Sequence, residues 1–295
     1  MTDLTSAISA HPALGPLVGL QALFWLYGAF FLLRQASRRG IPSFGMTDTT
    51  LPPSGLLPSD LFVAAAFAIG GALALQQLVV LVAKPWYPPP KEGTLGFFHV
   101  LAGAGFQLGL LAGLAHAWFW HLRPIRRPAG SPVTAPHPPL SVRRILRGSF
   151  ITFAVSLSLI APASYLWQNL LAALGIPPEP QNMVTLFSQT GDFPSLLFMI
   201  VLAAVVAPVT EELIFRVGLY RWLRTRISPP LALIAPAILF ASIHDNPLSV
   251  LPPLTVLAVV LSLGYARYGH PAVPILAHAL FNLNTLALIL AGFPA

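Results

Sequence analysis

Long runs of apolar residues without any charge restrict the fold of this chain more than any other feature. One of them, residues 195–209, reads SLLFMIVLAAVVAPV. A helix needs about 20 such residues to cross the hydrocarbon core of a bilayer. Inside that core every backbone polar group must find its partner within the protein, which favours helices. The runs therefore predict an all-α fold, a polytopic bundle of about eight transmembrane helices.

The composition agrees with this prediction. The chain is 56% hydrophobic and only 8% charged, whereas an ordinary soluble domain carries about 25% charged residues. Too few charges are present to cover a water-soluble surface. Eight segments have the length and hydrophobicity of spans, at about 14–33, 57–83, 95–121, 149–174, 195–216, 230–246, 250–268 and 271–292.

The charged residues indicate how the spans are oriented. All arginines fall in or beside four regions, which are 34–39, 123–147, 216–226 and position 267. With eight spans these regions lie on one side of the membrane, and by the positive-inside rule that side is cytoplasmic. Because the basic residues are scattered between apolar spans, no nucleic-acid partner is predicted. The partners expected are the lipid bilayer and a membrane-associated protein or peptide, and no oligomeric state is predicted.

Two parts of the chain are distinguished. Residues 1–148 are expected to supply N-terminal spans and a basic, proline-rich cytoplasmic linker, and residues 149–295 a helical core. The first half contains three histidines on one predicted span, His99, His116 and His121. Their spacings of 17 and 5 do not place them on one face of an α-helix, so we interpret them as packing or interfacial residues.

The last hundred residues are different, because acids, an arginine, histidines and a carboxamide gather there in neighbouring spans. Glu212 and Arg216 are four residues apart and are expected to pair on one helix face. Glu211 lies about 100° round the helix and has no partner three or four residues away. A desolvated carboxylate without a cation fits a general base. The alternative is that both acids are ordinary charges at a cytoplasmic helix end.

Two further spans carry polar residues at helical spacing. His278 and Asn282 share one face and offer hydrogen-bond donors to a developing negative oxygen, although they also fit an interhelical hydrogen-bond pair. His244 follows Phe240 by one turn, which seats its ring against an aromatic surface. At 1.5 Å per residue, Glu211 lies about 24 Å from the outer end of its span, which is near the cytoplasmic side. His278 and His244 lie about 10 Å and about 20 Å from the cytoplasmic side, so the three residues are expected at different depths.

These three patterns resemble the motifs of the CPBP family of intramembrane proteases, which includes the type II CAAX prenyl endopeptidases and relatives linked to bacteriocin processing and immunity. The motifs are EExxxR at 211–216, FxxxH at 240–244 and HxxxN at 278–282, within about 195–290. The resemblance implies a helical bundle with a membrane-embedded active site for hydrolysis, which opens toward the cytoplasm. It also implies that Glu211 and His244 activate water, that His278 and Asn282 stabilise the oxyanion, and that Glu212, Arg216 and Phe240 support the site.

The resemblance leaves the metal as an alternative. Glu211, His244 and His278 supply the residue types of a three-ligand zinc site, but no HExxH motif is present and Asn282 is a poor zinc ligand. We therefore favour a glutamate-dependent mechanism without a cofactor. A bacteriocin-immunity or scaffolding protein without catalysis is the alternative function, followed by a proton-coupled transporter. The preference for arginine over lysine and the many alanines favour a bacterial protein of the inner membrane.

Overall fold

The computed structural model describes residues 14–39, 51, 54–89, 96–122, 140–177, 182–189 and 193–292. Its helices, with π-helical turns written η, are α2 (Leu14–Arg39), α3 (Pro58–Ala83), α4 (Phe97–His116), η1 (Ala117–Leu122), α5 (Val142–Ala173), α6 (Asn182–Gln189), α7 (Phe193–Val201), η2 (Leu202–Val206), α8 (Ala207–Glu212), η3 (Leu213–Tyr220), α9 (Arg221–Leu223), α10 (Pro229–Ser242), α11 (Pro247–Tyr268) and α12 (Ala272–Leu290). The predicted all-α polytopic bundle is confirmed.

Seven helical stretches among the described residues are long and apolar enough to cross a membrane. They are Leu14–Ser37, Pro58–Ala83, Phe97–Leu122, Val142–Ala173, Phe193–Leu223, Pro247–Tyr268 and Ala272–Leu290. The span expected at 230–246 is instead α10, which has 14 residues. At 1.5 Å per residue it is about 21 Å long, shorter than a hydrocarbon core of about 30 Å. The chain turns at residues 243–246, where Asn246 adopts a left-handed conformation with φ 51°.

Although α10 is short, α10 and α11 together bring the chain back to the side of the bundle where α10 begins. Leu233, near the beginning of α10, and Tyr265, near the end of α11, belong to one buried cluster with Tyr220 of the helix that precedes α10. The two helices therefore form a hairpin whose open end lies beside the arginines at 224, 226 and 267. This arrangement keeps the predicted grouping of these arginines. Residues 123–139 of the predicted linker lie outside the described residues, and the division at 148 stays a prediction.

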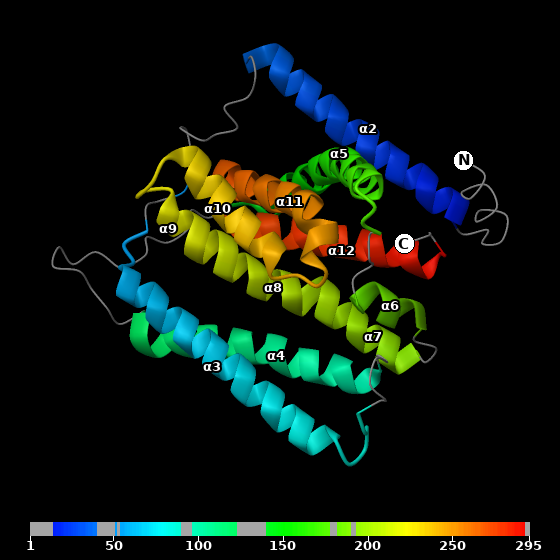
Figure 1. Cartoon of the computed structure of the whole chain (residues 1–295). Coiled ribbons are helices and arrows are strands. Elements are labelled where there is room, and N and C mark those ends of the chain that lie inside the picture. Colours follow the sequence, from blue (N-terminus) through cyan, green and yellow to red (C-terminus); the bar gives the residue numbers. More distant parts are fainter. Residues whose placement is uncertain are drawn as a thin grey trace.

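Helices α3 and α4 form a hairpin along one side of the bundle, opposite α2 (Figure 1). Their backbones touch, because a Cβ atom added at Gly109 would collide with the carbonyl of Gly71 and one added at Gly113 with the carbonyl of Phe67. Small residues permit such close approach between helices in membranes, where van der Waals contact drives association.

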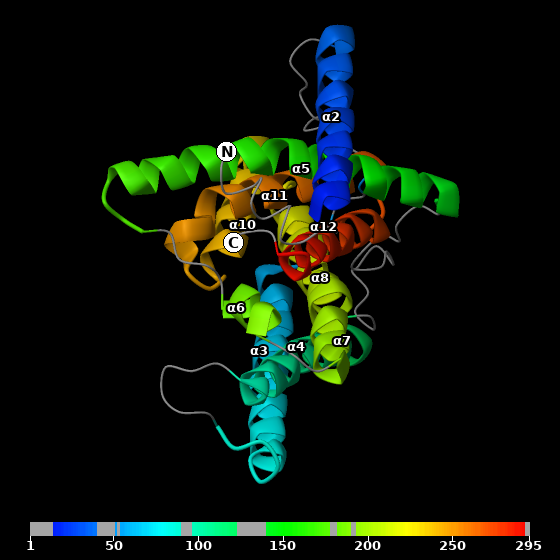
Figure 2. The same cartoon turned by 90° about the vertical axis from the view of Figure 1, so that its right-hand side faces the viewer.

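Helix α5 packs against α2, α11 and α12. It runs across the bundle and is crossed by α2 (Figure 2). Ser158 of α5 donates a hydrogen bond to the carbonyl of Trp25 in α2 at 2.7 Å. Phe153 and Leu157 of α5 pack in one buried cluster with residues of α11 and with Ala277 of α12. Because Ala277 precedes His278, this cluster fixes the depth at which α12 presents its polar side chains.

The structure corrects the interpretation of two histidines in the first half. His116 and His121 lie side by side, with 5.5 Å between ring centroids, and both pack on Phe67 at 4.8 and 4.7 Å. The π-helical turn η1 explains the difference, since a wider turn brings residues five apart onto nearly the same face. The prediction that these two histidines do not share a face was wrong, whereas their packing role agrees with the ring contacts.

Candidate active site

The acidic pair lies on one continuous helix, α7 to α9, that is interrupted by π-helical turns on both sides of α8. Pro208 contributes to the first interruption, because proline has no backbone N–H. The amide of Ala207 donates to the carbonyl of Leu202, five residues earlier. In the same register, the donor for the carbonyl of Ala203 would be residue 208. Asn282 of α12 donates its side-chain amide to that carbonyl at 2.7 Å instead.

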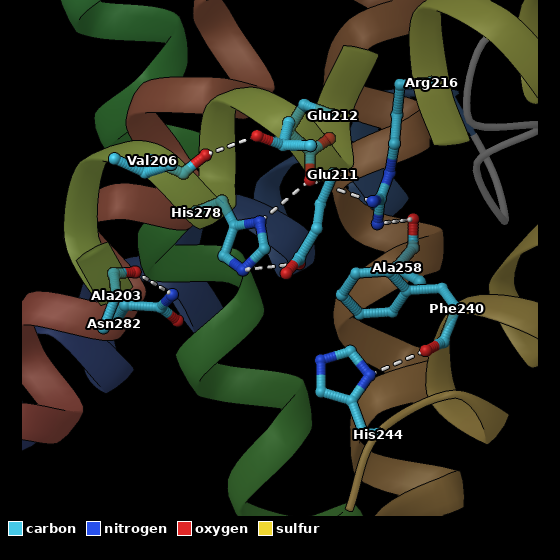
Figure 3. A network of polar contacts seen from close by, with 11 residues as sticks. Ala203, Val206, Glu211, Glu212, Arg216, Phe240, His244, Ala258, His278 and Asn282 are labelled. Carbon is cyan, nitrogen blue, oxygen red and sulfur yellow. Dashed lines mark hydrogen bonds and ion pairs between the residues drawn. The ribbon is translucent and has the colours of Figure 1, made fainter. Parts of the chain in front are cut away.

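Glu212 is the centre of a buried polar cluster (Figure 3). Its Oε1 atom accepts a hydrogen bond from Arg216 at 2.9 Å, so the ion pair predicted from the four-residue spacing is present. The same oxygen lies 2.9 Å from Nδ1 of His278, a contact that the sequence did not predict. The Glu212 and Arg216 side chains are 0% and 1% exposed. Glu212 therefore compensates a buried guanidinium and orients an imidazole from another helix.

Arg216 extends the cluster toward α10 and α11. It donates a second hydrogen bond to the carbonyl of Ala258 at 3.3 Å. Its guanidinium carbon lies 4.7 Å from the centroid of the Phe240 ring, in a cation–π arrangement. Phe240 is fully buried and meets the Phe215 ring edge-on at 5.3 Å. A phenylalanine at 240 thus covers the buried charge and joins α10 to the helix of the acidic pair.

Glu211 is placed differently from its neighbour. Its Oε2 atom lies 3.9 Å from Nε2 of His278, beyond ordinary hydrogen-bond length. Its side chain is 17% exposed, compared with 0% for Glu212. His278 therefore lies between the two carboxylates, with Nδ1 toward Glu212 and Nε2 toward Glu211 (Figure 3). Of the two acids, Glu211 is therefore the more exposed.

His244 occupies the turn after α10 and is half-buried. Its Nδ1 lies 2.7 Å from the carbonyl oxygen of Phe240, and the two rings pack at 4.7 Å between centroids. The Phe240 ring also lies edge-on to the His278 ring at 6.0 Å. The different depths estimated from helix length do not separate the two histidines, because His244 and His278 both contact the Phe240 ring.

The residues proposed for zinc do not form a ligand cluster. Among the described residues, no three or more His, Cys, Asp or Glu side chains are arranged to hold a metal ion. The present arrangement does not fit a three-ligand metal site, and no chemical step is derived through one.

Comparison with known proteins gives one result for this region. Residues 193–284 match a family model described as type II CAAX prenyl endopeptidase Rce1-like. These residues form an Rce1-like domain. The match includes all three motifs and supports the resemblance of this region to CPBP proteases and, in general terms, a CAAX-type membrane endopeptidase activity. Searches of curated proteins and of solved structures found no match.

The Rce1-like domain also contains contacts that the sequence interpretation missed. The carbonyls of Ala203 and Ala258 accept hydrogen bonds from Asn282 and Arg216. A signal for the first contact was present, since Pro208 leaves a carbonyl four or five residues earlier without its backbone donor. No comparable signal existed for the second, which joins residues 42 positions apart.

Proposed function

We propose that this chain hydrolyses a peptide bond of a membrane-associated protein or peptide near the cytoplasmic face, with Glu211 and His244 activating the attacking water. The observation that carries the proposal is the contrast between the two acids. Glu212 is fully buried and engaged with Arg216 and His278, whereas Glu211 is partly exposed and lies 3.9 Å from Nε2 of His278. One carboxylate has a supporting role, and the other is available for chemistry.

The hydrogen bonds of the two histidines indicate which nitrogens react. A carbonyl and a carboxylate both accept hydrogen bonds, so Nδ1 carries the proton in His244 and in His278. The Nε2 of neutral His244 then has a lone pair that can accept a hydrogen bond from water. The rings of His244 and His278 both contact the ring of Phe240 (Figure 3). This placement supports His244 as the partner of Glu211.

The charge of the cluster supports a shared proton. Glu211, Glu212 and Arg216 together carry one excess negative charge when both acids are ionised. Buried charges are stable only when they are paired. One further proton, on Nε2 of His278 or on Glu211, makes the cluster neutral. With the proton on Nε2, His278 can donate to an oxyanion, as its proposed role requires, while Glu211 remains a base.

The resulting reaction balances without a cofactor. Glu211, aided by His244, takes a proton from water while the water oxygen bonds to the scissile carbonyl carbon. The carbonyl electron pair moves to oxygen, where His278 donates a hydrogen bond. Asn282 keeps one side-chain N–H beyond the one given to Ala203, and that N–H is proposed as the second donor. When the tetrahedral intermediate collapses, the C–N bond breaks and the amine leaving group takes the proton from Glu211.

The substrate is proposed from the family and from the orientation of the chain. Candidates are a prenylated tail of the kind that CAAX prenyl endopeptidases process, another lipidated protein, or a bacterial leader peptide. We propose that the site opens toward the cytoplasm, because the arginine-bearing helix ends lie on that side by the positive-inside rule. The proposed location is a bacterial inner membrane.

A cleavage assay on the reconstituted full chain tests the catalytic assignment. Replacing Glu211 with Ala or Gln, or His244 with Ala, is expected to lower turnover at least 100-fold, the range of general acid–base contributions. Asp245→Asn is the matched control, since Asp245 is an exposed acid next to His244. Unchanged turnover in the Glu211 variants would refute the assignment. Absence of turnover by the wild type on prenylated, lipidated and leader peptides would instead support a role in immunity or scaffolding.

A further inference from the structure

The turn that carries His244 is held from outside the α10–α11 hairpin. Residues 243–246 join the two helices, and Asn246 is the only non-glycine residue with positive φ among the described residues. Backbone hydrogen bonds lie on both sides of the turn, from the amide of His244 to the carbonyl of Ala241 at 3.4 Å and from the amide of Ser249 to the carbonyl of Asn246 at 2.9 Å. Within the hairpin the His244 ring is held by the carbonyl and the ring of Phe240. The position of this ring relative to α5 and α12 therefore depends on how the hairpin is attached to the bundle.

The beginning of α11 has a backbone carbonyl that its own helix cannot satisfy. In an α-helix the carbonyl of Leu248 would accept from the amide of residue 252, but that residue is Pro252 and has no N–H. Trp167 of α5 fills this position, since its indole Nε1–H donates to the Leu248 carbonyl at 2.7 Å. The bond joins residues 81 positions apart and ties α11, four residues after His244, to α5.

We propose that Trp167 is a positioning residue for catalysis, which holds His244 at the position where it can act together with Glu211 and His278. The proposal rests on the function proposed above. Helix α5 packs against Ala277 through Phe153 and Leu157, and it contacts the beginning of α11 through Trp167. One helix thereby sets the positions of both histidines. Loss of the Trp167 bond releases the His244 turn and leaves the support of His278 in place.

A tryptophan near a membrane surface has a simpler explanation, because such residues commonly direct the indole N–H to lipid headgroups. Here the N–H is given to a backbone carbonyl that has no donor in its own helix. The two explanations predict different consequences for Trp167→Phe. An anchor for lipid would change neither the protection of the turn nor the turnover of a bound substrate, whereas a positioning residue would change both.

The test uses Trp167→Phe in the full chain, with Trp222→Phe as the matched control. Trp222 donates the same kind of bond, from Nε1 to the carbonyl of Leu56 at 2.9 Å, and this bond does not involve residues 243–250. We expect backbone amide exchange at 243–250 to rise about 5- to 10-fold in Trp167→Phe only, the range of one neutral hydrogen bond. We expect kcat to fall by a similar factor with KM unchanged, since binding does not use the turn.

Each result decides the proposal. If amide exchange at 243–250 is unchanged in Trp167→Phe, Trp167 does not anchor the turn. If exchange increases but kcat is unchanged, Trp167 has no positioning role in catalysis. An equal loss of kcat in Trp222→Phe would show general destabilisation and would also overturn it. If the wild type cleaves no substrate, the proposed function fails and the catalytic part of this proposal fails with it. In that case the exchange measurement still decides whether Trp167 anchors the turn.

Discussion

Replacing Glu212 with Gln tests whether this residue compensates the buried Arg216. The substitution keeps the shape of the side chain and one carbonyl oxygen, but it removes the charge that faces a guanidinium only 1% exposed. Breaking a buried ion pair by removing one partner costs about 3–5 kcal/mol, because the remaining charge is left without compensation. At 1.4 kcal/mol per factor of ten, the folded fraction relative to the unfolded one falls about 100- to 5,000-fold.

A double-mutant cycle separates the charge from the packing. Arg216→Met keeps most of the side-chain volume that covers Phe240 and removes the guanidinium. The double variant Glu212→Gln/Arg216→Met leaves no unpaired charge in this pair, so its loss of stability should be smaller than the sum of the two single losses by about 1–3 kcal/mol. Thermal unfolding of the purified chain in detergent, followed by the monodisperse fraction that survives heating, measures all three variants.

Two outcomes would refute this reasoning. If Glu212→Gln unfolds at the wild-type temperature, Glu212 does not compensate Arg216. If the losses of the single variants simply add in the double variant, the two side chains are not energetically coupled despite their 2.9 Å contact. The double variant still lacks the carboxylate that contacts Nδ1 of His278. If this contact orients His278, the double variant should regain stability without regaining turnover.

Three further predictions follow from the same structure. Asn282→Ala should lower stability by about 1–3 kcal/mol, because the carbonyl of Ala203 loses its donor; Asn284→Ala is the control, and equal melting of the two variants would refute it. Gly113→Val should destabilise the α3–α4 hairpin by about 1–3 kcal/mol or more, since the added Cβ collides with the Phe67 carbonyl; Gly103→Val, which meets nothing within 4 Å, should melt like the wild type. Turnover should survive EDTA and phenanthroline, and a loss that zinc restores would contradict the glutamate-dependent mechanism.

Local spacing predicted part of the site correctly. The pair of Glu212 and Arg216 follows from a four-residue interval, because such residues meet on one helix face wherever the helix lies. The contact between Glu212 and His278 spans 66 positions and depends on how α12 packs against α8. Nothing in a helical period reports that packing. The spacing therefore predicts one partner for Glu212, whereas the structure shows two partners on the same oxygen, Arg216 and His278.

The errors arose where the chain departs from a regular α-helix. The α-helical period predicts that His116 and His121 lie on different faces of their helix, whereas the π-helical turn η1 brings their rings together. The hydrophobic run at 230–246 predicted a full span, but its last residues form the turn that carries His244. A membrane segment is recognised by its total hydrophobicity, which does not distinguish a 14-residue helix followed by a turn from one continuous helix.

The wide turn at Leu202–Val206 gives the motif helix an unusual tolerance to deletion. In an uninterrupted α-helix, losing one residue would turn all later side chains by about 100° relative to earlier ones. A π-helical turn already contains one residue more than the α-helical path requires. Deleting a residue within it can convert the turn to an α-helix while Glu211 and Glu212 keep their direction toward α12. Deleting residue 204, 205 or 206 would place Pro208 four residues after Ala203, so the carbonyl now bound by Asn282 would still lack a backbone donor. The shortened helix would therefore keep both the orientation of the acids and the need for the carboxamide of Asn282.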